Sequence, residues 1–399
     1  MKTLFLFLTV FLCFYIPSFA QTNWVVYDTI NSPLPNNTVY KVVSDNSGNI
    51  WAATFKGLAK FDGSNWTIYD SIPNTSYALK NLFALAYDEV NDFIYVSMPG
   101  LLIRFDGINW NTWNHQGYSN ENVIDAQGNV WMALYSVGVG VFDGTSISYY
   151  NTFNSPIPSS LVADIEMDNN GDFWILAGDG LTHFDGTTWT IFDTSNTSLP
   201  SNAIYGVGTD QNNLLWVHGN LTQNSAFIYT YNGSTWTAFD TTICQPLNAF
   251  SFIESDALNK IWIGTYGEGL QMINGLNCSV YTDANSPLPT NYILDIHITN
   301  SQTMWIATQL SGLIKVDLPV GVSETPRDEV FGIHPNPASD KITITDFPGG
   351  IVRISNVLGV VVFSADFGSA GSVEIDINML ASGVYTVKTV TGNSKIIKL

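Results

Sequence analysis

The chain has 399 residues, of which 45% are hydrophobic, 13% aromatic and 12% charged, and its formal net charge is −20 at pH 7. It is too long for one small domain, and its aromatic content excludes an intrinsically disordered chain, because such chains are poor in aromatics. The excess of 34 Asp and Glu over 14 Lys and Arg argues against binding to nucleic acid or to anionic lipid, because both ligands need a basic surface.

Residues 1–20 have the pattern of a secretory signal peptide. Lys2 supplies a positive charge, residues 4–15 are apolar, and Ser18 and Ala20 are small residues at the positions that a signal peptidase recognises. We expect cleavage before Gln21; the alternative interpretation is a buried N-terminal strand. No later segment approaches the ~18 consecutive apolar residues of a membrane-spanning helix. The sequence therefore predicts an exported chain without a membrane span.

A seven-residue motif, DNSGNIW at residues 45–51, recurs through the middle of the chain. Related segments begin at Asp125, Asp168, Asp210 and Asp256, and two looser copies complete the series. The aromatic residues that end the seven copies are Trp51, Tyr95, Trp131, Trp174, Trp216, Trp262 and Trp305. A Phe-Asp-Gly turn, or a variant of it, follows each of the first six copies, and a strand rich in aromatic residues often comes next.

Each repeat is interpreted as four short strands. Apolar and polar residues alternate, turn residues come every ~8–12 positions, and no segment shows sustained helical periodicity. A period of about 40–45 residues with four strands is typical of a β-propeller blade. Seven sets of the first three strands lie between Val39 and Asp317, but only six fourth strands follow them. Residues 23–28 (NWVVYD) have the pattern of the missing fourth strand. We therefore expect them to pair with the third strand of the last blade, near residues 313–316, and to cover its exposed sheet edge.

The repeats resemble the two-component regulator propeller family. IWIGT at residues 261–265, followed by GEGL at 267–270, is the copy nearest to the family pattern, and the resemblance extends over residues 24–317. It implies an all-β fold: a seven-bladed propeller over residues 21–317, with the N-terminal strand closing the last blade. The family is known from the sensor regions of hybrid histidine kinases, which bind signals such as glycan fragments. This chain departs from those proteins, because it has neither room for a kinase nor a membrane helix.

The C-terminal part of the chain differs in composition. Residues 318–330 are rich in proline, glycine and charged residues, and are interpreted as a linker. Alternating segments then predict a small, immunoglobulin-like antiparallel β-sandwich over residues 331–399. The segments HPNPA (334–338), NVLG (356–359) and LASGVY (380–385), followed by a basic tail, resemble the type A C-terminal sorting domain of the type IX secretion system.

That resemblance implies a sorting signal that includes Pro335, Asn336, Pro337, Gly359, Gly383, Tyr385 and Lys398. It also implies the type IX secretion machinery as a partner and transport across the outer membrane of a Gram-negative bacterium. Removal of the domain would then release the protein or attach it to the cell surface. The alternative is an ordinary immunoglobulin-like domain that binds carbohydrate.

Ten turn aspartates are expected on one face of the propeller, because the first and third turns of a blade lie on the same side. They are Asp45, Asp62, Asp88, Asp106, Asp125, Asp143, Asp168, Asp185, Asp210 and Asp256. One interpretation is a surface that binds Ca²⁺; the other is a set of turn caps, which the repeat spacing favours. The sequence therefore predicts no metal ion and no cofactor, with Ca²⁺ as the alternative.

The loops between the second and third strands lie on the opposite face and vary between repeats. We predict ligand-binding residues on them, because aromatic rings stack on sugars while carboxylates and amides bind hydroxyl groups. These residues are Phe55, Tyr135, Asp179, Tyr266, Glu268 and Gln309. His218 and Asn220 are expected on the same loops. The alternative is that all of them are ordinary exposed loop residues.

Positions four and two residues before the turn aspartate identify polar side chains on the innermost strands. Asp164, Glu166, Asp295 and His297 are candidates for an acid/base set of a hydrolase or lyase. The alternative is a water-filled channel lined by solvated groups. The sequence carries no nucleophile motif, phosphate loop or Cys/His spacing of a zinc site, so no catalytic residue is assigned. Cys244 and Cys278 either form a disulfide, which export permits, or remain unpaired.

Two hypotheses of function follow. The first is a non-catalytic binding module, secreted or held at the cell surface, whose ligand is a glycan or a protein. The second is a secreted hydrolase or lyase that acts on polysaccharide through carboxylates in the channel.

Overall fold

The computed structural model describes residues 24–178, 180–222, 225–239, 251–275, 277–299, 303–318, 331–347, 349–356, 361–368, 371–389 and 393–399. The chain divides into two compact units, residues 1–319 and 320–399. All regular secondary structure in the described ranges is β-strand. No helix with the length and apolar character needed to cross a membrane occurs in these ranges.

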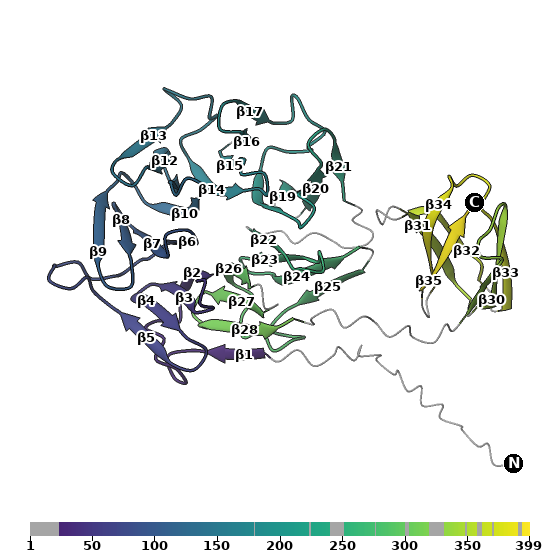
Figure 1. Cartoon of the computed structure of the whole chain (residues 1–399), viewed down its shortest axis with the longest axis horizontal. Helices are drawn as coiled ribbons and strands as arrows, with labels where there is room; N and C mark the ends of the chain where they lie inside the picture. The colour runs from purple at the N-terminus through teal and green to yellow at the C-terminus, as the bar shows by residue number, and fades with distance from the viewer. Residues whose placement is uncertain are drawn as a thin grey trace, which may run out of the picture. The chain divides into compact units, whose positions relative to one another are not determined.

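The first unit contains seven four-stranded antiparallel sheets within the described ranges (Figure 1). The first sheet consists of β2 (Val39–Ser44), β3 (Ile50–Thr54), β4 (Gly57–Phe61) and β5 (Trp66–Tyr69). The second consists of β6 (Ala84–Asp88), β7 (Phe93–Met98), β8 (Leu101–Phe105) and β9 (Trp110–Asn114). The third consists of β10 (Ser119–Ile124), β11 (Val130–Leu134), β12 (Gly138–Phe142) and β13 (Ile147–Tyr150).

The fourth sheet consists of β14 (Val162–Met167), β15 (Phe173–Ala177), β16 (Leu181–Phe184) and β17 (Trp189–Phe192). The fifth consists of β18 (Ile204–Thr209), β19 (Leu215–Thr222), β20 (Ser225–Tyr231) and β21 (Trp236–Ala238). The sixth consists of β22 (Ser251–Ser255), β23 (Ile261–Thr265), β24 (Gly269–Asn274) and β25 (Asn277–Tyr281). The seventh sheet joins β26 (Ile293–Ile298), β27 (Thr303–Thr308) and β28 (Leu313–Asp317) to β1 (Trp24–Tyr27).

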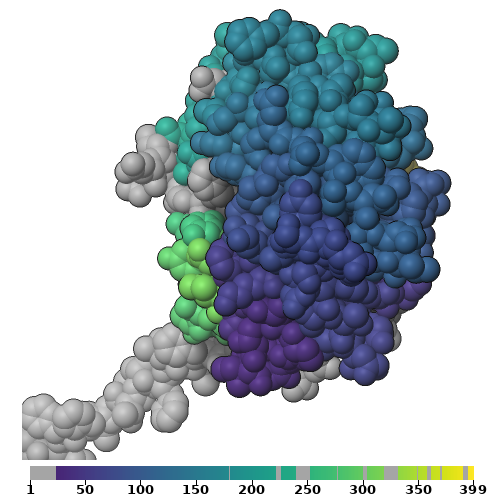
Figure 2. All heavy atoms as spheres, turned by 90° about the vertical axis from the view of Figure 1, so that its left-hand side faces the viewer, coloured from purple at the N-terminus to yellow at the C-terminus, as the bar shows by residue number. Residues whose placement is uncertain are grey.

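The N-terminal strand pairs with the last third strand, as the sequence predicts. Trp24 lies opposite Val316 and Tyr27 opposite Leu313 in an antiparallel register. The ring of Tyr27 contacts Phe61 and Trp305, with centroid separations of 5.3 and 5.9 Å, so it packs between the first and seventh sheets. Figure 2 shows purple residues of the first sheet against green residues from the end of this unit. The strand therefore covers an edge of β28 that would otherwise be unpaired.

The turn aspartates hold the repeat together locally. All ten accept hydrogen bonds from backbone N–H groups two to four residues later in the chain, which is the role of a turn cap. In the first sheet, Oδ2 of Asp45 also accepts a hydrogen bond from Nε1 of Trp51 at 2.9 Å. The motif Asp-x-x-x-x-x-Trp thus fixes the turn and the indole together, which explains why both residues recur.

The hydrophobic core lies between neighbouring sheets. Trp51 of β3 and Phe105 of β8 pack across the first and second sheets with centroids 6.1 Å apart, and Trp131 and Phe173 pack across the third and fourth at 4.1 Å. Strands such as β3 are buried along their whole length, because both of their faces meet another sheet. The aromatic residue of each repeat therefore serves packing between sheets.

The second unit contains two antiparallel sheets. One consists of β29 (Gly332–His334), β30 (Lys341–Phe347) and β33 (Gly371–Asp376); the other of β32 (Val361–Asp366), β31 (Ile351–Asn356), β34 (Gly383–Lys388) and β35 (Asn393–Lys398), in these spatial orders. Alternate residues of both sheets are buried in one core that includes Ile342, Ile354 and Val387. The two sheets therefore pack face to face, as expected for strands with one apolar side.

Several sequence predictions lie outside the described residues. They are the signal peptide at 1–20, residues 319–330 of the linker, Asp179, Gly359 and Cys244. Cys278 lies on β25 and is disulfide-bonded.

Candidate functional site

The first strands of the seven sheets surround the centre of the first unit. Each contacts the next, from β2 through β6, β10, β14, β18 and β22 to β26, and β26 contacts β2 again (Figure 1). Five of these strands carry a β-bulge near their start. In β2, Val39 pairs with Thr54 and Lys41 with Ala53, so Tyr40 is the extra residue. A bulge redirects side chains at this point, and Tyr40 and Lys41 both line one central cavity.

The central cavity has a volume of about 400 Å³ and an aromatic rim. Tyr40 and Phe83 pack edge to face at 4.8 Å, and Phe83 lies 5.8 Å from Tyr118. Tyr118 and Tyr135 are nearly parallel at 5.2 Å, and both are exposed. These four residues form a continuous series of rings, which we call the aromatic arc. Tyr205 and Phe252 also line the cavity.

The cavity floor is charged. Nζ of Lys41 forms ion pairs with Glu121 and, at 3.3 Å, with Oδ1 of Asp295. Oδ2 of Asp295 accepts the backbone N–H of Val42 at 2.8 Å, and Oδ1 of Asp164 accepts that of Ile165 at 2.9 Å. Lys41, Glu121 and Asp164 line the cavity together. One ammonium group therefore lies among several carboxyl groups in the cavity that the aromatic arc also lines.

Burial and mutual repulsion alter the acidity of these groups. Burial raises the pKa of Glu121 to about 7, although Lys41 opposes this, and the negative charges of Asp164 and Asp295 raise it further. Burial raises the pKa of Glu166 well above its usual value, and the charges of Asp164, Glu121 and Glu254 add to this effect. Burial likewise raises the pKa values of Asp164 and Asp295. Burial lowers the pKa of Lys41, but the surrounding carboxylates outweigh it and raise that pKa.

His297 connects a second group of side chains. Its Nε2 accepts the backbone N–H of Ser44 at 3.1 Å and lies 2.8 Å from Oγ of Ser44, while its Nδ1 is 3.7 Å from Oε1 of Glu254. Burial lowers the pKa of His297, but the hydrogen bond and charge of Glu254 outweigh it, so the pKa is raised overall. Oε2 of Glu254 is buried and has no hydrogen-bond partner among the described residues. A further cavity of about 450 Å³, beside the Asp turns, is lined by Ser44.

The structure separates the residues that the sequence predicts as ligand-binding. Tyr135 lines the central cavity, whereas Phe55, Tyr266, Glu268 and Gln309 do not. Phe55 is exposed on the turn between β3 and β4. The hydroxyl of Tyr266 donates to Oε1 of Gln309 at 2.9 Å, so these two residues form a separate contact between the sixth and seventh sheets.

The expected loop position of His218 and Asn220 is wrong. Both lie within β19, which extends to Thr222, and His218 is completely buried. Among the predicted acid/base residues, Asp164 lines the cavity and Asp295 binds its Lys41, whereas His297 contacts Ser44 and Glu254.

Most of the aromatic arc is missing from the sequence prediction. Tyr40 and Phe83 of the arc, and Tyr205, which also lines the cavity, each stand five residues before a turn aspartate, next to the position four residues before it. Strand alternation places these two positions on opposite faces, but the bulge in β2 brings both Tyr40 and Lys41 to the cavity. Comparing the fifth position before each turn across the repeats is a signal that finds these aromatics.

Each of the two units contains a segment that matches a known family. Residues 33–56 match the family described as two component regulator propeller, and residues 332–399 match the family described as secretion system C-terminal sorting domain. Both resemblances noted in the sequence are confirmed. No curated protein sequence matches the chain.

Several solved structures are similar. PorZ, a surface component of the type-IX secretion system of Porphyromonas gingivalis, is 18% identical with a TM-score of 0.57, over 94% of this chain and 60% of that one. The extracellular domain of a hybrid two component system from B. thetaiotaomicron is 18% identical, with a TM-score of 0.62, over 95% and 55%. A virginiamycin B lyase from Staphylococcus aureus is 14% identical, with a TM-score of 0.60, over 75% and 100%. At these identities the likeness concerns the fold, and the chain spans less than two thirds of the first two proteins.

Proposed function

We propose that this chain is a secreted or surface-held glycan-binding protein built on a seven-bladed β-propeller. The seven sheets, the contact of β26 with β2 and the pairing of β1 with β28 support the blade count. The match of residues 332–399 to a sorting domain supports export by the type IX machinery of a Gram-negative bacterium. Residues 1–20 would direct the chain across the inner membrane first, and residues 331–399 would form an immunoglobulin-like sorting domain.

The aromatic arc is the observation that carries the glycan proposal. Binding sites for small ligands are concave, have volumes of roughly 300–1,000 Å³, and combine aromatic walls with a few polar groups. The central cavity has this size and composition, with exposed rings of Tyr118 and Tyr135 above Lys41 and Glu121. A sugar ring stacked on the arc would place its hydroxyl groups toward the charged floor. A cavity of about 400 Å³ suits the end of a glycan better than a folded protein surface.

A glycan array with the full chain tests this proposal. We expect saturable binding to one polymer class, and a loss of affinity of about tenfold or more for Tyr118→Ala and Tyr135→Ala, since 1.4 kcal/mol corresponds to about a factor of ten. Phe153→Ala is the control, because Phe153 is 97% exposed and does not line the cavity. Tyr266→Ala tests whether the separate contact of Tyr266 with Gln309, also predicted to bind the ligand, contributes to glycan affinity. Folded protein that binds no glycan, or that binds equally after both cavity substitutions, contradicts the proposal.

A hydrolase or lyase acting on polysaccharide is the second candidate. It is favoured by the raised pKa of Glu166, because burial and the neighbouring carboxylates make this carboxyl group hold its proton more tightly, which suits a general acid beside Asp164. If the chain degrades a polysaccharide, the double variant Asp164→Asn, Glu166→Gln should abolish turnover. Turnover that survives this double change excludes these carboxyls as the catalytic pair.

A further inference from the structure

The fourth sheet differs from the first at two positions around its turn. In the first sheet, Nδ2 of Asn49 donates to both carboxylate oxygens of Asp45, at 2.9 and 2.8 Å, and Nζ of Lys60 lies 3.9 Å from Oδ2. In the third sheet, Asn129 likewise donates to Asp125 at 2.8 Å. These contacts show how the first and third sheets satisfy the turn carboxylate.

The fourth sheet replaces both of these partners. Asp172 stands at the position of Asn49, four residues after the turn aspartate Asp168. His183 stands at the position of Lys60, because each lies opposite the tryptophan of its sheet. Asp168 therefore loses the amide donor, and a second carboxylate takes its place. Two carboxylates this close repel each other unless a cation lies between or beside them.

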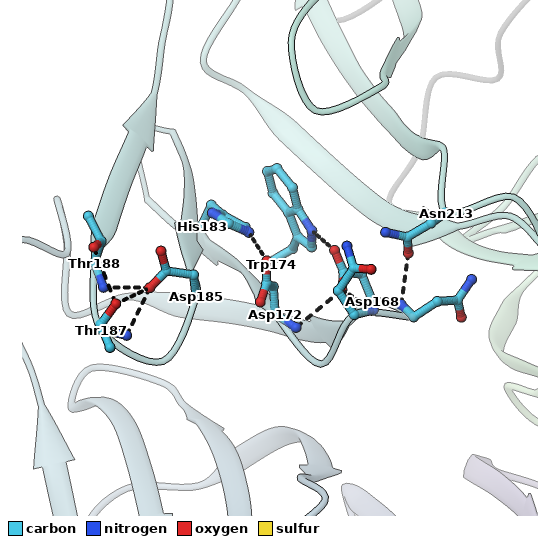
Figure 3. Close-up of polar contacts among 10 residues, drawn as sticks. Asp168, Asp172, Trp174, His183, Asp185, Thr187, Thr188 and Asn213 are labelled. Atoms are coloured by element: carbon cyan, nitrogen blue, oxygen red, sulfur yellow. Dashed lines mark hydrogen bonds and ion pairs between the residues drawn. The ribbon is translucent and has the colours of Figure 1, made fainter.

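The three side chains converge. Nε2 of His183 lies 3.0 Å from Oδ2 of Asp172, and one ligand atom from each of Asp168, Asp172 and His183 lies within 4.8 Å of the others. Figure 3 shows the imidazole and the Asp172 carboxylate pointing at each other, with Asp168 on the far side of the turn beside Trp174. In the parts of the chain that the structure describes, no other group of His, Cys, Asp and Glu meets this criterion.

Asp168 retains capacity for a ligand. Its Oδ1 accepts the backbone N–H groups of Asn170 and Asp172, whereas among the described residues its Oδ2 accepts only Nε1 of Trp174, at 3.3 Å. Asp168 is 7% exposed, so this oxygen is largely shielded from water. The side chains of Asp172 and His183 are 27% and 20% exposed, which gives an ion access from solvent.

We propose that Asp168, Asp172 and His183 bind a divalent transition-metal ion, with Zn²⁺ as the ion of best fit. One imidazole nitrogen and two carboxylate oxygens are ligands that zinc accepts at about 2.0–2.2 Å, with a water molecule completing a tetrahedral site. Calcium and magnesium prefer oxygen ligands alone, so the imidazole selects against them. Such bond lengths require the ligand atoms, which lie within 4.8 Å of one another here, to approach within about 3.5 Å when the ion binds. The site would tie β16 to the turn between β14 and β15.

Calorimetric titration of the full chain with ZnCl₂ tests the proposal. We expect one site that Ca²⁺ and Mg²⁺ do not occupy. Asp172→Asn and His183→Lys should each weaken Zn²⁺ binding by more than the 10- to 100-fold typical of losing an outer-shell partner. Both substitutions restore residues that the first sheet already uses, so the variants should remain folded. Equal Zn²⁺ affinity in Asp172→Asn, or no Zn²⁺ binding by the unaltered chain, overturns the proposal and leaves His183–Asp172 as a simple ion pair.

A transplant supplies an independent test. The double variant Asn49→Asp, Lys60→His gives the first sheet the same three side chains around Asp45. The stoichiometry of Zn²⁺ binding should then rise from one to two per chain. The single variant Lys60→His is the matched control and should still bind one ion. A stoichiometry that stays at one in the double variant contradicts the claim that these three residues suffice.

Discussion

Nζ of Lys41 lies 3.3 Å from Oδ1 of Asp295, so an ion pair joins the first and seventh sheets across 254 positions of sequence. Oδ2 of the same aspartate accepts the backbone N–H of Val42. The ring of sheets is therefore fastened at its centre as well as at its edge, where β1 pairs with β28.

Removing the central cation should strongly destabilise the fold. Lys41→Met leaves Glu121 and Asp295 buried without a counter-charge, and breaking a buried pair in this way typically costs about 3–5 kcal/mol. Denaturant unfolding at pH 7 measures the loss. Lys56→Met is the control, because Lys56 is exposed on a turn and should change stability by less than about 0.5 kcal/mol. Identical unfolding midpoints for both variants would show that the pair contributes nothing.

Stability should fall as the pH rises from about 4.5 to about 7. The pKa of Glu121 is raised from 4.5 to about 7, so the folded chain holds a proton through this range that the unfolded chain has released. The raised pKa values of Glu166, Asp164 and Asp295 act in the same direction. His297 does so as well, because a raised histidine pKa contributes stability that is complete below 6.5 and is lost as the pH passes the folded value.

The measurement is the free energy of unfolding at pH 5 and at pH 7.5. Glu121→Gln should reduce the difference by up to ~3 kcal/mol, since each pKa unit corresponds to about 1.36 kcal/mol. Glu89→Gln, at an exposed position, should leave the difference unchanged. A chain that is more stable at pH 7.5 than at pH 5 disproves this account.

The N-terminal strand should contribute stability through its inward side chains. Tyr27→Ala removes contacts with Phe61, Trp66 and Trp305, and loss of a large packed aromatic side chain costs about 3–5 kcal/mol. Val25→Ala on the same strand should cost little, because Val25 points outward and is 41% exposed. Deleting residues 21–30 should cause aggregation or a clear loss of stability. Thermal melting compares all three, and a deletion variant that melts like the intact chain refutes closure by this strand.

Asn336 should hold the C-terminal strand in the second unit. Its Nδ2 donates to the carbonyl of Lys395 at 2.7 Å, and its Oδ1 accepts the N–H of Ile397 at 2.8 Å. Asn336→Ala leaves both backbone groups without this partner, so hydrogen exchange at Ile397 should accelerate about two- to tenfold, as a net loss of about 0.5–1.5 kcal/mol implies. Asn378→Ala, on an exposed turn, should not change it. An unchanged exchange rate at Ile397 would show that contacts other than those of Asn336 hold β35 in place.

The disulfide of Cys278 should involve Cys244. Cys278 is disulfide-bonded, and Cys244 is the other cysteine that remains after the predicted cleavage before Gln21. Cys244→Ser should therefore expose one thiol per mature chain to a thiol reagent under denaturing conditions, where the unaltered chain exposes none. Two free thiols in the unaltered secreted protein would contradict the pairing.

Repetition made the fold predictable from sequence. The motif from Asp45 to Trp51 needs only local contacts to form its turn and indole hydrogen bond, so its recurrence reports the number and spacing of the sheets. The pairing of β1 with β28 followed from counting strands, because one sheet lacked its fourth strand. The sorting-domain segments at 334–338 and 380–385 were recognisable for the same reason, as local sequence patterns.

The sequence by itself therefore determined the repeat, the turn caps and the strand that completes the last sheet, since each depends on short-range patterns. Only the tertiary structure decided which side chains meet at the centre. The bulges that bring Tyr40 and Lys41 to one cavity break strand alternation, and alternation is the rule by which sequence assigns faces. The contact of Lys41 with Asp295 depends on how seven sheets close around an axis, which no local pattern encodes.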